Sequence, residues 1–528
     1  MNSRRIFHRK AYFILLLMLA AILPISVYAS SVIQFLLLLN WITEGRFREK
    51  WGRIIHSRAF LVYSLFFLVH LLAMTWSTDL EYGLKDLKIK LPILFIPLLV
   101  VSSEPLQMKD TRHILAAFIA GNVIGSFSSV LALLELIPME LEGYRNASLF
   151  INHIRFSLMV VLSILFAGYL FFRKEKGEPR SIRLFYLFAI IWLTVFLLVL
   201  RSLSGIFILA LIILILAFRY LQTVRQPGIR ILFSSVIVLL PLLAILYTVY
   251  AVNRFYDVEE LDTAELETFT AEGNAYIHHT DNKEIENGHY VWIYLCPEEL
   301  RREWNTRSDY PYMGKTENGD MIRFTLIRYL ASKGLRKDAS GVQQLTNEDV
   351  EAIEQGIANH IYLNRFALYP RIYELIWEFD RYRLGYSPND KSLVQRYYYL
   401  KAGVHIAADN LLYGVGTGDV RKAFQDYYEE TNSPLRHERR RRAHNQFLTF
   451  AIAFGIPGLI VCLFALVYPA TVGKRIHAYL VLVFLLTMAL SMLDEDTLEN
   501  TSGAVMFGLF YGVLIFGGTL HPSGKMQE

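Results

Sequence analysis

The stretch Leu184–Phe218 reads LFYLFAIIWLTVFLLVLRSLSGIFILALIILILAF, and Arg201 is the one charged residue in it. A helix that crosses a bilayer needs about 20 mostly apolar residues. The stretch is long enough for two such helices joined by a short turn at Arg201. This pattern predicts a membrane protein that crosses the bilayer more than once.

The rest of the 528-residue chain has the same character. Hydrophobic residues make up 54% and charged residues 19% of it, whereas soluble domains carry about 25% charge. We therefore expect an all-α polytopic membrane protein. About twelve transmembrane helices are predicted, at approximately 11–26, 28–43, 57–76, 91–103, 113–136, 153–172, 183–200, 203–218, 231–251, 445–469, 477–493 and 501–518. The fourth segment is short unless it includes the Lys-bearing stretch from Leu84.

The short loops alternate in charge, and short cytoplasmic loops collect Lys and Arg. The basic loops surround Arg4–Lys10, Arg46–Arg58 and Arg173–Arg183, and the alternate loops, Ser77–Gly83, Pro138–Phe150 and Asp494–Asn500, are neutral or acidic. Twelve spans with both ends in the cytoplasm fit this pattern. The N-terminal segment has a signal-peptide-like start, but its apolar run continues to Trp41, so we expect an uncleaved anchor.

One long polar block interrupts the apolar segments. Residues 251–443 hold 25 Lys and Arg against 31 Asp and Glu. The chain is thus expected to have three parts: helices in 1–250, a large periplasmic loop domain in 251–443, and helices in 444–528. His289–Cys296 and Met321–Leu330 alternate like short strands, so we expect an α/β insert first. Helices follow, with helical spacing or helix-start signals, in Asn347–Leu363, Arg371–Arg383, Leu393–Ala408 and Asp419–Glu430.

The composition excludes several other classes of protein. The two cysteines, Cys296 and Cys462, match no metal-ligand or redox spacing and cannot form a disulfide framework. Excess positive charge lies in short loops between apolar segments, which argues against a nucleic-acid partner. No Asp-rich or His-rich cluster suggests a metal site.

Arg201 and His444 are the first two candidate site residues. A charged group at a membrane boundary usually pairs with another group, although Arg201 could instead extend to the outer interface. His444, in Ala443-His-Asn-Gln-Phe-Leu448, opens the tenth predicted span. A histidine there can exchange a proton near neutral pH, as a general base does; a structural histidine is the alternative.

Further candidates lie in the polar block. Arg396 precedes Leu411-Leu-Tyr-Gly-Val-Gly-Thr-Gly-Asp419, a glycine-rich turn that could offer N–H groups to a phosphate or could simply connect two helices. Arg436-His-Glu-Arg-Arg-Arg-Arg442 leads into His444. This basic cluster could bind anionic lipid headgroups or a diphosphate, or contact acids of the same loop. Arginine suits a diphosphate because its planar fork binds oxygens in pairs.

In their order and spacing these motifs resemble the O-antigen ligase and polymerase superfamily, in its Bacteroidetes form. The resemblance rests on Arg-Ser-Leu-Ser-Gly205, Arg396, Gly-Val-Gly-Thr-Gly-Asp419, Arg-Ala-His-Asn-Gln-Phe-Leu448 and Gly-Ile-Pro-Gly-Leu459. It covers about residues 150–520. The long insert at roughly 251–390 departs from enterobacterial-type ligases and leaves the acceptor open.

The resemblance implies a metal-independent, inverting glycosyltransferase without a cofactor, in the bacterial inner membrane with its active site facing the periplasm. The donor would be an undecaprenyl-diphosphate-linked glycan, and the acceptor a hydroxyl of lipid A-core or another hydroxyl, among membrane lipids. His444 would be the catalytic base, and Arg201 and Arg396 would bind the diphosphate. Secondary candidates are His153, Arg155, Arg442 and Asn445.

Three other functions remain open at this stage. An O-antigen polymerase uses the same donor but extends a lipid-linked chain, and a protein O-oligosaccharyltransferase modifies protein. A glycolipid transporter would have no catalytic residues, but transporters tend to show internal repeats, which we do not find in this sequence.

Overall fold

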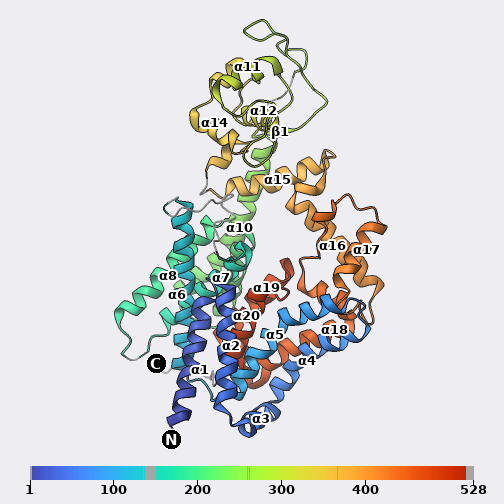
Figure 1. Ribbon diagram of the computed structural model, residues 1–528. Helices are drawn as coiled ribbons and strands as arrows, with labels where there is room; N and C mark the ends of the chain where they lie inside the picture. Colours follow the sequence, from blue (N-terminus) through green and yellow to red (C-terminus); the bar gives the residue numbers. More distant parts are fainter. Residues whose placement is uncertain are drawn as a thin grey trace. The chain divides into compact units, whose positions relative to one another are not determined.

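The computed structural model describes residues 3–134, 136, 150–175, 177–258, 260, 262–364 and 367–518 (Figure 1). It divides into two compact units. Unit 1 contains Met1–Phe233 and Gln395–Glu528, and unit 2 contains Ser234–Val394. The chain is therefore folded so that residues before and after unit 2 form one body.

Unit 1 is helical in its described part. Its N-terminal helices are α1 (Ser3–Ile22), α2 (Val27–Glu44), α3 (Phe47–His56), α4 (Arg58–Ala73), α5 (Leu80–Ser102), α6 (Met108–Leu133), α7 (His153–Phe172), α8 (Arg180–Val199) and α9 (Leu203–Leu221), with the 3-10 turn Met74–Trp76. Its C-terminal helices are α16 (Ser392–Asp409, from Gln395 on), α17 (Val420–Glu430), α18 (Gln446–Thr471), α19 (Tyr479–Asp494) and α20 (Thr501–Tyr511), with 3-10 turns at His437–Arg439 and Val472–His477 and a π turn at Gly512–Phe516. α10 (Pro227–Tyr256) begins in unit 1 and ends in unit 2.

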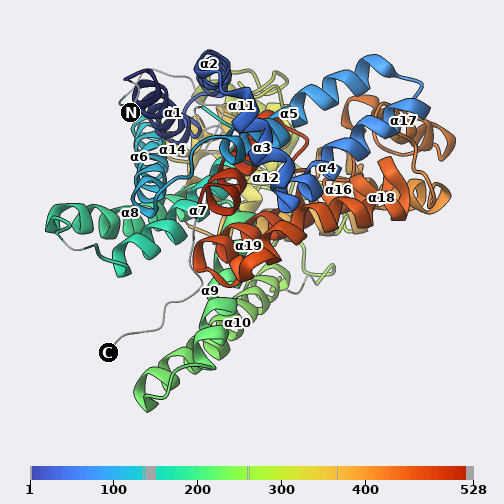
Figure 2. The ribbon, with the colours of Figure 1, turned by 90° about the horizontal axis from the view of Figure 1, so that it is seen from below.

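The core of unit 1 lies around α7. Every residue from Phe156 to Ala167 is buried, and α7 packs against α6, α8, α9 and α19. Helices from the two ends of the chain also lie side by side: α4 packs on α18 and α5 on α20 (Figures 1 and 2). Side-chain caps begin several of these helices; Ser202 accepts a hydrogen bond from the Gly205 N–H at the start of α9.

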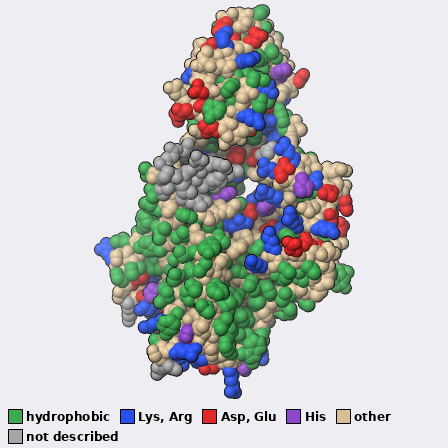
Figure 3. Space-filling model, in the orientation of Figure 1, with side chains coloured by type: hydrophobic (Ala, Val, Ile, Leu, Met, Phe, Trp, Pro, Cys, Tyr) green, Lys and Arg blue, Asp and Glu red, His purple; other side chains and the backbone are tan. Residues whose placement is uncertain are grey.

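Hydrophobic side chains cover much of the surface over α1 and α2 (Figure 3). On α2, Phe35 is 63% and Leu39 46% exposed. Exposed apolar patches of this extent indicate contact with lipid or another apolar partner. Together with the helices this indicates a helical, multi-pass membrane protein.

The predicted apolar segments all fall on helices. Eight described helices are long and apolar enough to cross a membrane. α19 and α20 are shorter, and α5 begins at Leu80, so it includes the Lys-bearing stretch from Leu84. How many helices cross the bilayer stays a prediction. Of the predicted loop Pro138–Phe150, only Phe150 lies within the described residues.

Unit 2 is also mainly helical in its described part. Besides the end of α10 and the start of α16, it contains α11 (Pro297–Arg307), α12 (Ile322–Ser332), α13 (Ala339–Gln343), α14 (Asn347–Glu354), α15 (Tyr369–Arg383) and 3-10 turns at His360–Leu363 and Pro388–Asp390. Strands β1 (Ile285–Glu286) and β2 (His289–Tyr290) pair antiparallel, Ile285 opposite Tyr290. Trp304, Leu326, Leu330 and Ile353 are fully buried in its core.

The expected α/β character of this insert is not supported. The predicted strand at Met321–Leu330 is wrong, because α12 covers all of it but the first residue. Ile322, Leu326 and Leu330, four residues apart, are all completely buried in the core of unit 2, so burial of this face selects the helical period in a stretch that also alternates. Of His289–Cys296, only the first two residues form a strand.

The four helices predicted in the polar block are confirmed, with one interruption. The segment Asn347–Leu363 is divided into α14 and the 3-10 turn His360–Leu363. The compact units do not follow the predicted loop 251–443, because residues 395–443 pack within unit 1. Which residues lie outside the membrane stays a prediction.

Candidate functional site

His444 lies two residues before the first residue of α18. Asn445 is the N-cap of this helix: its side-chain oxygen accepts the Leu448 N–H at 2.9 Å, and its Nδ2 donates to the Leu493 carbonyl at 3.0 Å. His444 itself has φ +51°, a left-handed conformation that is uncommon for a residue with a side chain. Asn445, a secondary candidate from the sequence, thus holds the backbone beside His444.

Arg396 and His444 meet at one carboxylate, Glu495. Arg396 Nη2 donates to Glu495 Oε1 at 2.8 Å, and His444 Nδ1 lies 3.4 Å from Glu495 Oε2. Arg396 also pairs with the carboxylate of Asp494. These groups come from α16, from the residue that precedes the N-cap of α18 and from the C-terminal end of α19. Two candidates 48 positions apart in the sequence therefore share a site.

The electrostatics of Glu495 follow from these neighbours. Burial raises its pKa, but the hydrogen bond and charge of His444 and the charge of Arg396 outweigh burial and hold the pKa below its ordinary value. The carboxylate is 12% exposed, whereas the His444 side chain is 27% exposed. Glu495 therefore stays ionised and faces Nδ1 of His444.

Arg201 lies in the turn between α8 and α9. It has φ +50° and is 3% exposed, so it does not extend to solvent. Two serines that follow Arg201 form hydrogen bonds: the Ser202 hydroxyl donates to Ser157 Oγ at 2.9 Å, and the Ser204 hydroxyl donates to Asp494. Asp494 thus joins the residues that follow Arg201 to Arg396.

Two secondary candidates begin α7. His153 is its first residue and Arg155 its third, and both are partly buried. The charges of Glu495 and Asp496 act on Arg155. Arg155 therefore lies within electrostatic reach of the acidic loop that also holds Arg396 and His444.

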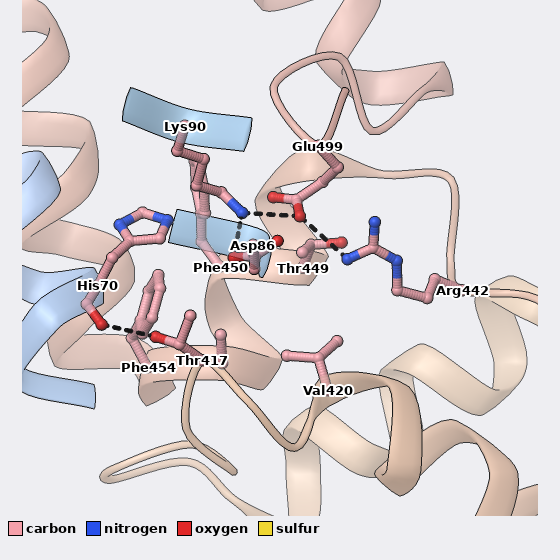
Figure 4. A pocket seen from close by; sticks show the side chains of 11 residues that line it. His70, Asp86, Lys90, Thr417, Val420, Arg442, Thr449, Phe450, Phe454 and Glu499 are labelled. Atoms are coloured by element: carbon pink, nitrogen blue, oxygen red, sulfur yellow. Dashed lines mark hydrogen bonds and ion pairs between the residues drawn. The ribbon is translucent and has the colours of Figure 1, made fainter. Parts of the chain in front are cut away.

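The structure gives Arg442 a buried ion partner. Its Nη1 lies 3.0 Å from Glu499 Oε2, and Glu499 is 3% exposed (Figure 4). The charges of Glu499 and Asp496 raise the pKa of Arg442 despite its burial. The basic cluster Arg436–Arg442 could bind anionic ligands or contact acidic residues. At Arg442 the structure shows contact with an acidic residue.

The glycine-rich turn packs against protein, which favours the connecting turn over the phosphate loop. The Val415 N–H donates to the Ile452 carbonyl at 2.8 Å and the Gly416 N–H to the Ala453 carbonyl at 2.9 Å. The Gly418 N–H donates to Ser77 Oγ at 3.0 Å. Because these donors are used within the protein, the motif connects α16 to α17 against the kinked part of α18.

Sequence reasoning missed the acidic side of the site. Asp494 is the last residue of α19, and Glu495 and Glu499 lie between α19 and α20. In the sequence they indicated only that the loop Asp494–Asn500 is acidic. Tyr399 was also missed; its ring lies 5.6 Å from the His444 ring. An acidic run directly after an apolar segment was the available signal. Within the described ranges, no group of three or more metal-binding side chains is found.

Comparison with known proteins supplies the family. Residues 355–463 match the family model described as O-antigen ligase. This match supports membership of the O-antigen ligase superfamily. The part that matches the O-antigen ligase model includes Arg396, the glycine-rich turn and His444, and it supports an O-antigen ligase-type function in general. No curated protein matches the chain.

Proposed function

We propose that this protein is a glycosyltransferase that moves a glycan from undecaprenyl diphosphate to a hydroxyl of lipid A-core, at the periplasmic face of the bacterial inner membrane. The observation that carries the proposal is the meeting of Arg396 and His444 at Glu495. The proposed cation for the diphosphate and the proposed base for the hydroxyl then share one carboxylate, and both belong to the segment that matches the ligase family.

The proposed reaction needs one proton acceptor and a cationic site for the leaving group. The acceptor oxygen attacks the anomeric carbon with inversion, while the bond from this carbon to the diphosphate oxygen breaks. His444 Nε2 takes the hydroxyl proton, and the undecaprenyl diphosphate leaves with the bonding electrons. Orientation and neutralisation of the leaving group supply most of the catalysis, so the proposal includes no metal ion and no cofactor.

Arg201 and Arg396 are the proposed diphosphate ligands, with Arg155 as a further cation nearby. Arg396 is paired with Asp494 and Glu495 in the structure. Because a diphosphate is a bidentate, strongly charged partner for arginine, it would replace the pair with Asp494, whose side chain is 41% exposed. Glu495 would remain on His444 Nδ1 and stabilise the protonated ring.

The test is complementation of a strain that lacks the gene, with lipopolysaccharide run on a silver-stained gel. His444→Ala, Arg396→Ala and Arg201→Lys are compared at equal membrane levels with two controls on the same segments, His437→Ala and Arg421→Ala, both exposed in the structure. We expect the three site variants to leave core-only lipopolysaccharide while lipid-linked glycan accumulates, and both controls to restore the ladder.

The same gel separates the other functions. Core capped by a single repeat in the deletion strain would mean a polymerase, and an unchanged ladder would point to a protein O-oligosaccharyltransferase. If Arg201→Lys and His444→Ala both restored the ladder fully, a transporter without catalytic residues would replace the proposed enzyme.

A further inference from the structure

A buried ionic cluster lies next to the proposed site, and Glu499 is its centre. Glu499 Oε2 accepts from Lys90 Nζ at 2.8 Å and from Arg442 Nη1 at 3.0 Å, and Oε1 accepts from Gln446 Nε2 at 2.9 Å. Lys90 also pairs with Asp86, one turn earlier on α5. Figure 4 shows Lys90 and Arg442 approaching Glu499 from opposite sides.

The cluster is not a substrate pocket. The cavity that it lines has a volume of about 10 Å³, room for about one water molecule. Lys90 is 2% exposed and lies about 15 Å along the axis of α5 from its first residue. Buried ion pairs stabilise a fold little more than well-packed apolar residues would, because both charges lose their water. Stability alone therefore gives little reason to bury Asp86, Lys90 and Glu499 together.

What the cluster does hold is the backbone on both sides of His444. Arg442 and Gln446 lie two residues before and two residues after it, and both donate to Glu499. Gln446 Oε1 also accepts the Leu498 N–H at 2.8 Å, from the residue preceding Glu499. Residues 442–446 are thus tied at both ends to a single carboxylate.

His444 needs such a tie because of its conformation. A non-glycine residue with φ near +51° persists where the surroundings impose it. Released at either end, the segment can relax toward ordinary φ values, which would swing the ring away from Glu495. The 3.4 Å contact between His444 and Glu495 is too long to hold the ring by itself.

We propose that Glu499, with Lys90 as its buried counter-ion, is a positioning residue for His444 that fixes the loop Arg442–Gln446 in the catalytic geometry. This inference rests on the proposed function, because it takes His444 as the base. Glu499 does not touch the substrate and acts only through the loop.

Glu499 also keeps its charge. Burial raises its pKa, but the charges of Lys90 and Arg442 outweigh burial and hold the pKa well below its ordinary value. Glu499 is therefore a charged acceptor for Arg442 and Gln446.

The experiment compares three variants of the purified full-length protein in the transfer assay. Glu499→Gln removes the negative charge at the centre of the cluster. Gln446→Met removes the hydrogen bond from Gln446 to Glu499 without changing any charge. Glu438→Gln is the matched control, an exposed carboxylate in the same basic segment. We expect kcat to fall about 10- to 100-fold in Glu499→Gln and less in Gln446→Met, with the donor KM within about twofold of wild type, and no change in Glu438→Gln.

Hydrogen exchange gives a readout without activity. Exchange should rise in the peptide 440–448 of Glu499→Gln and stay unchanged in α7. A uniform rise across unit 1 would show a merely structural role and overturn the inference, as would wild-type kcat in either folded variant. If His444→Ala is inactive while Glu499→Gln is fully active, only this inference fails; full activity of His444→Ala would refute the proposed function itself.

Discussion

Gly414→Ala should destabilise the protein because the glycine-rich turn is packed against α18. Gly414 has φ +67°, and a Cβ built there would lie 2.3 Å from the backbone carbon of Ala453 and 2.3 Å from the backbone nitrogen of Phe454. The left-handed conformation alone costs a side chain about 1 kcal/mol. Moving two backbone atoms of a buried segment adds about 2–3 kcal/mol. The expected loss of stability is therefore about 3–4 kcal/mol.

Gly473→Ala is the matched control. Gly473 has φ +65°, and a Cβ at this position would meet no atom within 4 Å, so only the conformational cost of about 1 kcal/mol applies. Thermal unfolding of the detergent-solubilised protein, followed by size-exclusion chromatography, compares the two variants. If Gly414→Ala melts like Gly473→Ala and only weakens donor binding, the turn contacts phosphate and the packing argument is wrong.

Three further predictions concern unit 2 and the chemistry. Burial lowers the pKa of Lys337 to about 7. Between pH 7 and the ordinary pKa of lysine the unfolded chain therefore binds one more proton than the folded chain, and stability rises with pH in that window. Lys337→Met should stabilise unit 2 by up to about 3 kcal/mol at pH 6.5 and by less at pH 9.5, measured by pulse proteolysis; an equal gain at both pH values would contradict this. Glu286 is completely buried and accepts from Arg328, Asn359 and Tyr373, so Glu286→Gln should cost about 3 kcal/mol in the same assay, against almost nothing for the exposed Glu348→Gln. Transfer activity should survive dialysis against EDTA, and its loss with recovery on adding a divalent cation would refute the metal-independent mechanism.

Much of the helical framework could be predicted from local sequence. The apolar segments coincide with helices because a run of about 20 apolar residues can satisfy its backbone in a membrane only as a helix. The helices predicted at Asn347–Leu363 and Arg371–Arg383 rested on similar local signals, namely acids in the first turn of one and helical spacing in the other. The strand predicted at Met321–Leu330 was wrong because the pattern fits both periods, and only burial in the core of unit 2 selects the helix.

The candidate site shows the same division. Arg201 and His444 could be singled out because a charge or a titratable ring beside an apolar helix is unusual in a local stretch of sequence. Arg396 was named because it precedes the glycine-rich turn in a motif order that resembles a known family. Asp494, Glu495 and Glu499 could not, because an acidic loop between two apolar helices looks solvated until its partners are known. Those partners, Arg396, Arg442 and Lys90, come from distant parts of the chain.

The sequence by itself determined that this is a helical membrane protein with cationic residues and a histidine at helix ends, because hydrophobicity, helix length and charge are local properties. The tertiary structure decided which of these groups meet. It joined Arg396 to His444 through Glu495, assigned Arg442 to Glu499, and turned the glycine motif into a packing turn, because these contacts depend on how α5, α16, α18 and α19 pack together rather than on any one segment.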